Sequence, residues 1–334
     1  MPGTIIITGA NGSLAIPAVQ HLLTKYSEYT AVLTVRNTSE LDPNTGRLHE
    51  AIAPFKSRTS VRRLNLSSLA EVKDFAQIVA TEIASGTLPP LKSIICNAYY
   101  WNLAGEAETT DDDLDKTFQV NHISHAALVL RLLGSFRPSP GEDLGRIVLF
   151  GSDAHWPGKN GLEKYPPTIP EDLEVLVKPP PKNDDLAGRG FHQYALSKLA
   201  VIMWMYALNR HLSKNENLKG ITAVAINPGN LSDSRALRTN TPWILRSMSR
   251  FIIRPLKPLL SLMDPTMRTS AEAGVDVAEL AVGETYAGEE GFFTLLQKDD
   301  SSPESQDAEK QEKLWKKTLE WAQISPMDTA MAIE

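Results

Sequence analysis

The fold of this chain is decided by the stretch Thr4-Ile5-Ile6-Ile7-Thr8-Gly9-Ala10-Asn11-Gly12-Ser13-Leu14-Ala15. Its first half is apolar and β-branched, as in a buried strand, and its second half is a turn that contains two glycines. Apolar residues at helical spacing follow as far as Lys25. The order strand, glycine turn, helix brings exposed backbone amides to the start of a helix, where they suit a pyrophosphate. An ordinary tight turn would look similar, so this stretch alone leaves the function open.

Strands and helices alternate through the first two thirds of the chain. Apolar and β-branched runs predict further strands at 31–35, 61–66, 91–97, 146–151 and 220–226. Apolar residues at helical spacing predict helices at 69–84, 111–133 and 191–212. The second of these opens with acidic residues, which stabilise the N-terminal end of a helix dipole. Such alternation predicts a parallel sheet with helices on both faces, joined by right-handed crossovers.

Composition places the chain among globular proteins. Its 334 residues are 42% hydrophobic and 22% charged, which predicts a single enlarged α/β domain over residues 1–334. A net charge of −6 offers no overall basic surface, so we expect no nucleic-acid partner. The chain has one cysteine, Cys96, no room for a signal peptide before its first strand, and no apolar run of membrane-spanning length. These features predict a cytoplasmic protein without a transmembrane segment.

Three segments interrupt the alternation. Residues 153–190 are rich in proline and predict an insertion that adds no strand. Residues 230–268 are apolar with interleaved arginines and lysine, which is typical of a substrate lid. The part from 243 to 262 also has the character of an interfacial helix, so peripheral membrane contact stays open. Residues 299–334 begin as a charged, serine-rich linker and regain helical spacing towards the end.

A second motif, Tyr194-Ala195-Leu196-Ser197-Lys198, lies on the predicted helix 191–212. Tyr194 and Lys198 are four residues apart and therefore share one face of the helix. Together with the glycine turn, this pattern resembles the short-chain dehydrogenase/reductase family, whose motifs are TGxxxGxG and YxxxK. An ammonium and an oxidised nicotinamide near the phenol favour its ionised form. Tyr194 can then exchange a proton with a substrate oxygen while hydride moves to or from carbon.

Further motifs resemble the same family and follow in its order. Ser152 ends a predicted strand, where the family places the serine that hydrogen-bonds the substrate oxygen. Asn121 resembles the asparagine that holds a water in the proton relay towards the lysine. Asn97-Ala98 resembles the NAG motif with Tyr99 in place of glycine, and Asn227-Pro228-Gly229 resembles the motif that lines the nicotinamide. The catalytic residues implied by the resemblance are Asn121, Ser152, Tyr194 and Lys198.

The residues after the second strand predict NADP(H) as the cofactor. Arg36 offers a permanently charged, bidentate group to a 2′-phosphate, and no carboxylate follows before Glu40. Arg36-Asn37 resembles the retinol dehydrogenase branch of the family, although a solvated arginine at a strand end stays the alternative. The residues expected to bind the cofactor are Thr8, Gly9, Asn11, Gly12, Ser13, Leu14, Arg36, Asn37, Asn65, Leu66, Asn97, Ala98, Tyr99, Tyr194, Lys198, Pro228, Gly229 and Leu231.

Two later stretches also resemble the retinol dehydrogenase branch. Arg268-Thr269-Ser270-Ala271-Glu272 resembles a motif that opens a helix, and Leu314-Trp315 resembles the C-terminal helix of that branch. Ser13 and Ala15 depart from the family's glycines in the first turn. Asp233 stands where the family usually has the threonine that touches the nicotinamide carboxamide.

The resemblance implies an NADPH-dependent enzyme that interconverts a ketone and a secondary alcohol, with Tyr194 as the acid or base. Aromatic residues after strand ends and in the lid predict a fairly large apolar or aromatic substrate. The residues expected to bind it are Tyr100, Trp101, His155, Trp156 and Trp243. We expect no metal, because no cysteine or carboxylate completes a ligand set around the histidines. An epimerase, dehydratase or cyclase of the same fold and a non-catalytic NADP(H)-binding regulator stay as alternatives.

The predicted architecture is a doubly wound, Rossmann-type α/β domain. It has a parallel seven-stranded sheet, the insertion before the catalytic helix, and a C-terminal helical lid. The insertion contains the apolar side chains of Leu173, Val175, Leu176 and Val177. It resembles the one that, in monomeric carbonyl reductases, folds over the helices through which other family members dimerise. The sequence therefore favours a monomer over a homodimer, with a place at the active-site mouth as the alternative for the insertion.

Overall fold

The computed structural model describes residues 3–136, 145–181, 185–248, 251 and 264–332. Its main sheet is formed by β1 (Gly3–Ile7), β2 (Tyr29–Val35), β3 (Thr59–Arg63), β4 (Leu91–Cys96), β5 (Gly145–Phe150), β6 (Ile221–Asn227), β9 (Gly291–Thr294) and β10 (Gln297–Lys298). Their order is β10-β9-β6-β5-β4-β1-β2-β3. The sheet changes direction at β1 and β4, so the chain winds outwards twice from its centre, and the predicted doubly wound α/β fold is confirmed.

The main sheet has eight strands among the described residues, one more than the seven predicted. Seven strands are parallel, and β10 adds an eighth that pairs antiparallel with β9. The chain turns back within two residues after β9, and Leu295 adopts a φ of 60° in that turn. A tight turn of this kind joins antiparallel neighbours, whereas parallel neighbours need a long crossover. All residues of β1 and β5 are buried, as expected for central strands that are covered on both faces.

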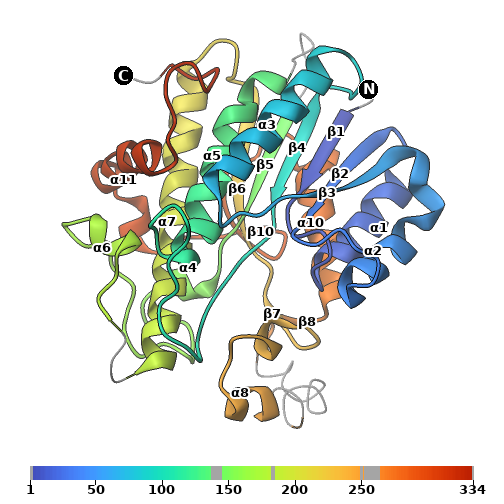
Figure 1. Ribbon diagram of the computed structural model, residues 1–334. Helices are drawn as coiled ribbons and strands as arrows, with labels where there is room; N and C mark the ends of the chain where they lie inside the picture. Colours follow the sequence, from blue (N-terminus) through green and yellow to red (C-terminus); the bar gives the residue numbers. More distant parts are fainter. Residues whose placement is uncertain (1–2, 137–144, 182–184, 249–250, 252–263, 333–334) are drawn as a thin grey trace.

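Helices cover both faces of the sheet. The described helices are α1 (Ala15–Lys25), α2 (Pro43–Ile52), α3 (Leu69–Ala84), α4 (Lys116–Phe118), α5 (Ser124–Leu132), α6 (Glu174–Val177), α7 (Leu186–Lys214), α8 (Trp243–Met248), α10 (Ser270–Val282) and α11 (Ala308–Trp321). One face carries α3, α5 and α7, with α11 packed outside α7, and the other carries α1, α2 and α10 (Figure 1). Gly274 lets α10 approach α1, because a Cβ there would lie 2.7 Å from the backbone nitrogen of Ala18.

Two helices begin elsewhere than the sequence predicts. The helix expected from residue 111 starts at Lys116, because Asp115 accepts a hydrogen bond from the backbone of Phe118 and caps it. A π-helix over Gln119–Ile123 then separates α4 from α5. The catalytic helix expected from residue 191 starts at Leu186, where Asp185 is the cap. Capping side chains rather than apolar spacing therefore decide where these helices begin.

The insertion and the C-terminal segment pack against α7. Gln193 donates a hydrogen bond to the carbonyl of Leu176 at 2.6 Å, and the indole of Trp321 donates to Glu174 at 3.3 Å. Of the four apolar residues singled out in the insertion, Val175 is exposed, and Leu173, Leu176 and Val177 are buried. The stretch expected to be a linker is also packed, because Ser301, Ser302 and Ser305 are fully buried. Hydrogen bonds from α7 and from the loop after β5 hold it in place.

The described part of the segment expected to be a lid lies beyond the carboxyl ends of the parallel strands (Figure 1). Its described part contains β7 (Asn230–Leu231), which pairs with β8 (Met267–Arg268), and the short α8. Residues 249–250 and 252–263, on which the remainder of the lid and membrane predictions depend, lie outside the described residues. Among the helices in the described part of the chain, none is long and apolar enough to cross a membrane.

Candidate active site

Three of the predicted catalytic residues meet at the carboxyl edge of the sheet. Tyr194 and Lys198 lie in the N-terminal half of α7, and the Lys198 ammonium is 5.5 Å from the centre of the Tyr194 ring. Lys198 is buried and donates a hydrogen bond to the carbonyl of Phe150, the last residue of β5, at 2.8 Å. Ser152 lies two residues beyond the end of β5 and donates its hydroxyl proton to Asp153 Oδ1 at 3.0 Å. This hydroxyl lies close enough to the Tyr194 phenol to lower the pKa of the phenol. The motif spacing has thus placed an acid, a cation and a hydroxyl in one site.

Burial determines the protonation of this site. It raises the pKa of Tyr194 well above its ordinary value, and the nearby hydroxyl of Ser152 offsets only part of that increase. Burial also lowers the pKa of Lys198 from 10.5 to about 7. The phenol therefore keeps its proton at neutral pH, which is the state needed to donate one.

Asn121 braces the site through its side chain. Its Oδ1 accepts from the backbone nitrogen of Tyr100 at 2.7 Å, and its Nδ2 donates to the Tyr100 carbonyl and to Ser197 Oγ, both at 2.9 Å. Ser197 in turn donates to the Tyr194 carbonyl at 2.6 Å. Asn121 lies in the π-helix, a distortion that is frequent at functional sites. The side-chain amide therefore ties the loop after β4 to the catalytic helix, and both of its N–H groups are engaged within the chain.

The glycine turn is tied to the loop after β4. Gly9 has a φ of 61°, and a Cβ at this position would lie 3.0 Å from Ala98. Asn97 Nδ2 donates to the carbonyls of Thr8 and Gly9 at 2.9 and 3.0 Å, and Thr8 Oγ1 accepts from the Ala98 nitrogen at 3.0 Å. These predicted cofactor residues therefore come together where β1 and β4 end side by side.

The N-terminus of α1 fits a phosphate group. Leu14 stands at its N-cap and supplies no side-chain hydrogen bond, and the first turn holds no acidic residue. The free amides at the start of a helix attract anions. Gly12 keeps the turn open, because a Cβ there would lie 3.1 Å from the Gly9 carbonyl. Asn11 donates to Thr45 in α2, and the hydroxyl of Ser13 accepts from Arg235 in the lid segment.

A cavity of about 390 Å³ lies at the expected adenosine end. It is lined by Arg36, Arg63, Asn65, Ser67, Thr109, Thr110, Asp111 and Lys116. The structure thus brings the predicted Arg36 and Asn65 together and adds two cations that the sequence reading missed. Arg63 ends the strand before Asn65, so its position in the sequence could have indicated that it belongs to this site. Lys116 is distant in the sequence from the other lining cations, so no local pattern connects it with the site. Asn37 bonds the Ser39 nitrogen, and Leu66 is buried beneath α5.

The predicted nicotinamide end lies after β6. Gly229 has a φ of 81°, and a Cβ there would lie 2.4 Å from the Thr266 carbonyl. Pro228 precedes it at the end of β6, and Leu231 belongs to β7. Asp233, which replaces the family threonine, accepts from the backbone and hydroxyl of Ser270, both at 2.8 Å. That carboxylate therefore stabilises the start of α10, which explains the departure from the family pattern.

Comparisons with known proteins agree with this geometry. Residues 235–331 match a family model described as the AcuH dehydrogenase domain. Dehydrogenase acuH of Aspergillus aculeatus is 58% identical over 82 residues, which cover 25% of this chain and 84% of that protein. The short-chain dehydrogenase iccH of Talaromyces variabilis is 29% identical over 98% of both chains. Retinol dehydrogenase 13 of Mus musculus is 26% identical over 94% of this chain and 82% of its own.

The chain belongs to the short-chain dehydrogenase/reductase family. Solved structures of the family share its fold. A short-chain dehydrogenase/reductase from Serratia marcescens gives a TM-score of 0.58 at 16% identity, over 88% of this chain and 96% of its own. The angucycline C-6 ketoreductase LanV, solved with NADP, gives a TM-score of 0.58 at 17% identity, over 87% of this chain and 93% of its own. At these identities the likeness concerns the fold, and it confirms the predicted Rossmann-type sheet.

Aromatic side chains surround Tyr194, the predicted catalytic tyrosine of this short-chain dehydrogenase/reductase. The ring centres of Trp101 and Tyr99 lie 5.3 and 6.4 Å from that of Tyr194. Leu245 of α8 packs into the same apolar cluster, which also contains Leu103, Leu162, Ala154, Phe191 and Ala195. Tyr99, predicted to contact the cofactor, thus also faces the catalytic side chain.

Of the five residues predicted to bind the substrate, Trp101 has a ring contact with Tyr194 and the other four have other surroundings. Tyr100 lies under the Lys116 ammonium, at 4.7 Å, with its hydroxyl bonded to Glu108. His155 is 1% exposed, because its Nδ1 bonds the Ser152 carbonyl and its Nε2 accepts from the Ser302 nitrogen. Trp156 stacks under Lys159 at 5.1 Å, and Trp243 is 73% exposed on α8. Position at a strand end does not decide the direction of a side chain, and only Trp101 reaches Tyr194.

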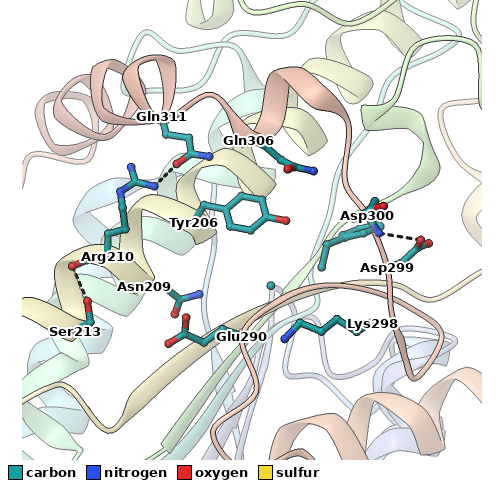
Figure 2. A pocket seen from close by; sticks show the side chains of 12 residues that line it. Tyr206, Asn209, Arg210, Ser213, Glu290, Lys298, Asp299, Asp300, Gln306 and Gln311 are labelled. Carbon is teal, nitrogen blue, oxygen red and sulfur yellow. Dashed lines mark hydrogen bonds between the residues drawn. The ribbon is translucent and has the colours of Figure 1, made fainter.

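A second hollow lies beside the C-terminal half of α7. Figure 2 shows this cavity of about 800 Å³, lined by residues of α7, β9, β10 and α11. Several of its polar side chains are hydrogen-bonded within the protein, and burial raises the pKa of Glu290, which also lines it. Tyr206 bonds Ser301 at 2.9 Å, Arg210 bonds Gln311, and Asn209 donates to the Ala223 carbonyl at 2.8 Å. None of the predicted catalytic residues lines it, so its size does not make it the active site.

Proposed function

We propose that this protein is an NADPH-dependent reductase that converts a large apolar or aromatic ketone into a secondary alcohol. The observation that carries the proposal is the meeting of Tyr194, Ser152 and Lys198 beside the glycine turn. NADPH would supply the hydride when bound. Tyr194 holds the proton for the substrate oxygen, Ser152 orients that oxygen, and Lys198 holds the nicotinamide ribose and provides positive charge.

The cofactor site is assigned by the chemistry of its side chains. The glycine turn and the start of α1 would take the pyrophosphate, and Pro228, Gly229 and Leu231 would line the nicotinamide. The cations around the cavity of about 390 Å³ favour NADP(H) over NAD(H). Arg36, Arg63 and Lys116 are suited to a 2′-phosphate, which would be a poor ligand next to an acidic side chain. Asp111 is the single carboxylate among the lining residues.

The substrate side is assigned to Trp101, Tyr99 and the lid segment 230–268. Leu245 packs against the cluster around Tyr194, so the described part of the segment already contacts the reacting end. Broad, flat apolar surfaces of this kind suit bicyclic or polycyclic rings better than short aliphatic chains. The AcuH dehydrogenase domain match begins at residue 235, so it includes most of this segment, and a related substrate loop is consistent with that.

We also propose that the protein is a monomer of the cytoplasm. Trp315 of α11 stacks on Trp204 of α7, with ring centres 5.9 Å apart, and both are buried. The C-terminal helix and the insertion thereby cover much of the α7 surface that other family members use for dimerisation. The single cysteine, Cys96, is buried and free, which suits a reducing compartment. Light scattering at micromolar concentration tests the monomer, and a dimer through α7 would overturn it.

Kinetics with the purified protein test the function. Loss of NADPH absorbance is followed with aliphatic, aromatic, bicyclic and polycyclic ketones, and the products are identified. We expect the polycyclic or aromatic ketones to be reduced with the higher kcat/KM. A product isomerised or dehydrated without net consumption of NADPH would favour the epimerase or dehydratase alternative. Tight binding of NADPH without turnover of any ketone would favour the regulator.

A further inference from the structure

Arg235 reaches from the loop after β7 to the glycine turn near the start of the chain. Its backbone nitrogen and its Nε each donate to Ser13 Oγ at 3.1 Å. Its two terminal nitrogens donate to the carbonyl of Asn11 and to Oδ1 of Asn44. The guanidinium therefore lies on the turn between β1 and α1 and against the N-terminus of α2.

The charge around Arg235 is not balanced by these contacts. Ser13, Asn11 and Asn44 are all neutral partners. Burial lowers the pKa of Arg235, and Arg47 and Arg238 lower it further, whereas Asp42 acts in the opposite direction. Asp42 Oδ1 is engaged as the cap of α2, where it accepts from two backbone nitrogens. A half-buried guanidinium with neutral acceptors and two like charges nearby is a place that an anion would stabilise.

The same spot carries a second, independent feature of an anion site. The other long helices that follow a loop have capping side chains, which are Asp42, Ser68, Asp185, Thr269 and Asp307 for α2, α3, α7, α10 and α11. The start of α1 has no such cap within the described structure. Its amides and the positive end of its dipole point to the turn that Arg235 covers.

Arg235 also connects this turn to the catalytic end. It lies close enough to Tyr99 for the two to interact electrostatically, and Tyr99 packs against Tyr194. Further along the same loop, Asn240 accepts from the Leu103 nitrogen at 2.8 Å and donates to the Trp101 carbonyl at 3.3 Å. One loop thus contacts both the glycine turn and the segment that carries Trp101.

We propose that Arg235 binds the pyrophosphate of the dinucleotide and so couples cofactor binding to the position of residues 232–242, which contact the segment of Trp101. The inference rests on the proposed function in that a dinucleotide must bind at this turn. The guanidinium would exchange the oxygens of Asn11 and Asn44 for two phosphate oxygens in a bidentate, charge-assisted contact. Ser13, where the family usually has glycine, would keep the backbone of Arg235 in place through its hydroxyl.

Two fragments of the cofactor can distinguish binding at the Arg235 site from binding at the adenosine end. ADP carries the diphosphate without a 2′-phosphate, and 2′-AMP carries the 2′-phosphate without the diphosphate. Isothermal titration calorimetry is done with both fragments on the full-length wild type, Arg235→Ala and Arg36→Ala. We expect Arg235→Ala to weaken ADP by about tenfold or more and to leave 2′-AMP within about twofold. Arg36→Ala should give the opposite pattern, and retained binding of either fragment shows that a variant is folded.

Matched variants complete the test. Arg246→Ala removes the same charge from the neighbouring helix α8 and should leave ADP affinity unchanged, because the Arg246 side chain donates to the Thr241 carbonyl. Arg235→Lys keeps the positive charge but loses the bidentate guanidinium. Its ADP affinity should lie between those of the wild type and Arg235→Ala. The proposal is overturned if Arg235→Ala binds ADP like wild type, or loses both fragments equally. A wild type that binds neither fragment nor NADPH would refute the proposed function itself, and the Arg235 site with it.

Discussion

The two halves of α7 (Leu186–Lys214) have very different surroundings. The N-terminal half presents Tyr194 and Lys198, whose pKa values burial shifts in opposite directions. The C-terminal half borders the cavity of about 800 Å³ in Figure 2. There Tyr206, Asn209 and Arg210 are hydrogen-bonded to neighbouring groups of the protein. Three polar side chains of the larger hollow are therefore already hydrogen-bonded, whereas in the N-terminal half of the helix burial has shifted the pKa values of both Tyr194 and Lys198.

This difference shows why volume is a weaker guide to function than the state of the side chains. Burial disfavours the charged forms of both groups, the phenolate of Tyr194 and the ammonium of Lys198, and such a cost is expected where chemistry needs these groups. A set of hydrogen bonds between α7, β10 and α11 stabilises the fold without offering a reactive group. Substitutions at matched residue types in the two halves of α7 can therefore test the comparison directly.

The largest effect is expected at the two tyrosines of α7. Tyr194→Phe removes the proton donor and should lower kcat at least about a hundredfold while NADPH binding is kept. Tyr206→Phe, which loses only the bond to Ser301, is the control and should keep near wild-type kcat. Steady-state kinetics of both variants measure kcat, and a thermal melt of each shows whether the variant is folded. Equal kcat in the two variants would remove Tyr194 from the mechanism.

Lys198→Met should reduce both kcat and NADPH affinity, because it deletes a cation that is buried beside the cofactor site. Lys298→Met, in the cavity of Figure 2, is the control. The pH profile sharpens the test. Burial lowers the pKa of Lys198 to about 7, so its charge is present below that pH and lost as pH rises through it. The kcat/KM for NADPH should fall above about pH 7 in wild type, and a profile of the same shape in Lys198→Met would exclude Lys198 as its origin.

Arg36→Ala should weaken NADPH by about tenfold or more and NADH by much less, because only NADPH has the 2′-phosphate. Arg210→Ala removes an arginine from the hollow beside the other half of α7 and should change neither affinity. Fluorescence titration with both cofactors measures the ratio. If Arg36→Ala weakens NADH as much as NADPH, the arginine has a structural role and the cofactor preference has another source.

The smallest effect is expected in the lid segment. Leu245→Ala removes apolar contacts with the cluster around Tyr194 and should raise KM for a polycyclic ketone by about fivefold. Ile244→Ala changes a side chain that is 60% exposed and should leave KM as in wild type. Measuring KM for one polycyclic and one aliphatic ketone in each variant tests the assignment. A rise of equal size for the aliphatic ketone would argue against a site shaped for large rings.

Much of the fold could be predicted because its signals are local. The helix predicted at 69–84 has those same bounds, and the strand predicted at 91–97 ends one residue earlier. The opening of α10 by Thr269 and Glu272 is a capping box that the sequence motif already contains. The strands β9 and β10 were not located, because four and two residues are too few for a periodic pattern. The π-helix around Asn121 leaves no mark in apolar spacing either.

For the site, the sequence by itself determined which chemical groups stand at the ends of strands and on one face of α7. Spacing along a helix and the parallel order of strands are local consequences of backbone geometry, so Tyr194, Lys198 and Ser152 meet as the motifs predict. The directions of side chains in the loops were decided only by the tertiary structure. Tyr99 faces Tyr194 while its neighbour Tyr100 turns towards Glu108.

Contacts between distant parts of the chain depended on the tertiary structure in the same way. His155 is buried because the C-terminal segment closes over it through Ser302, and Arg235 meets the glycine turn from the far side of the sequence. Each of these contacts joins segments more than a hundred residues apart. No local pattern encodes such a meeting, because it arises from how independently formed elements pack against one another.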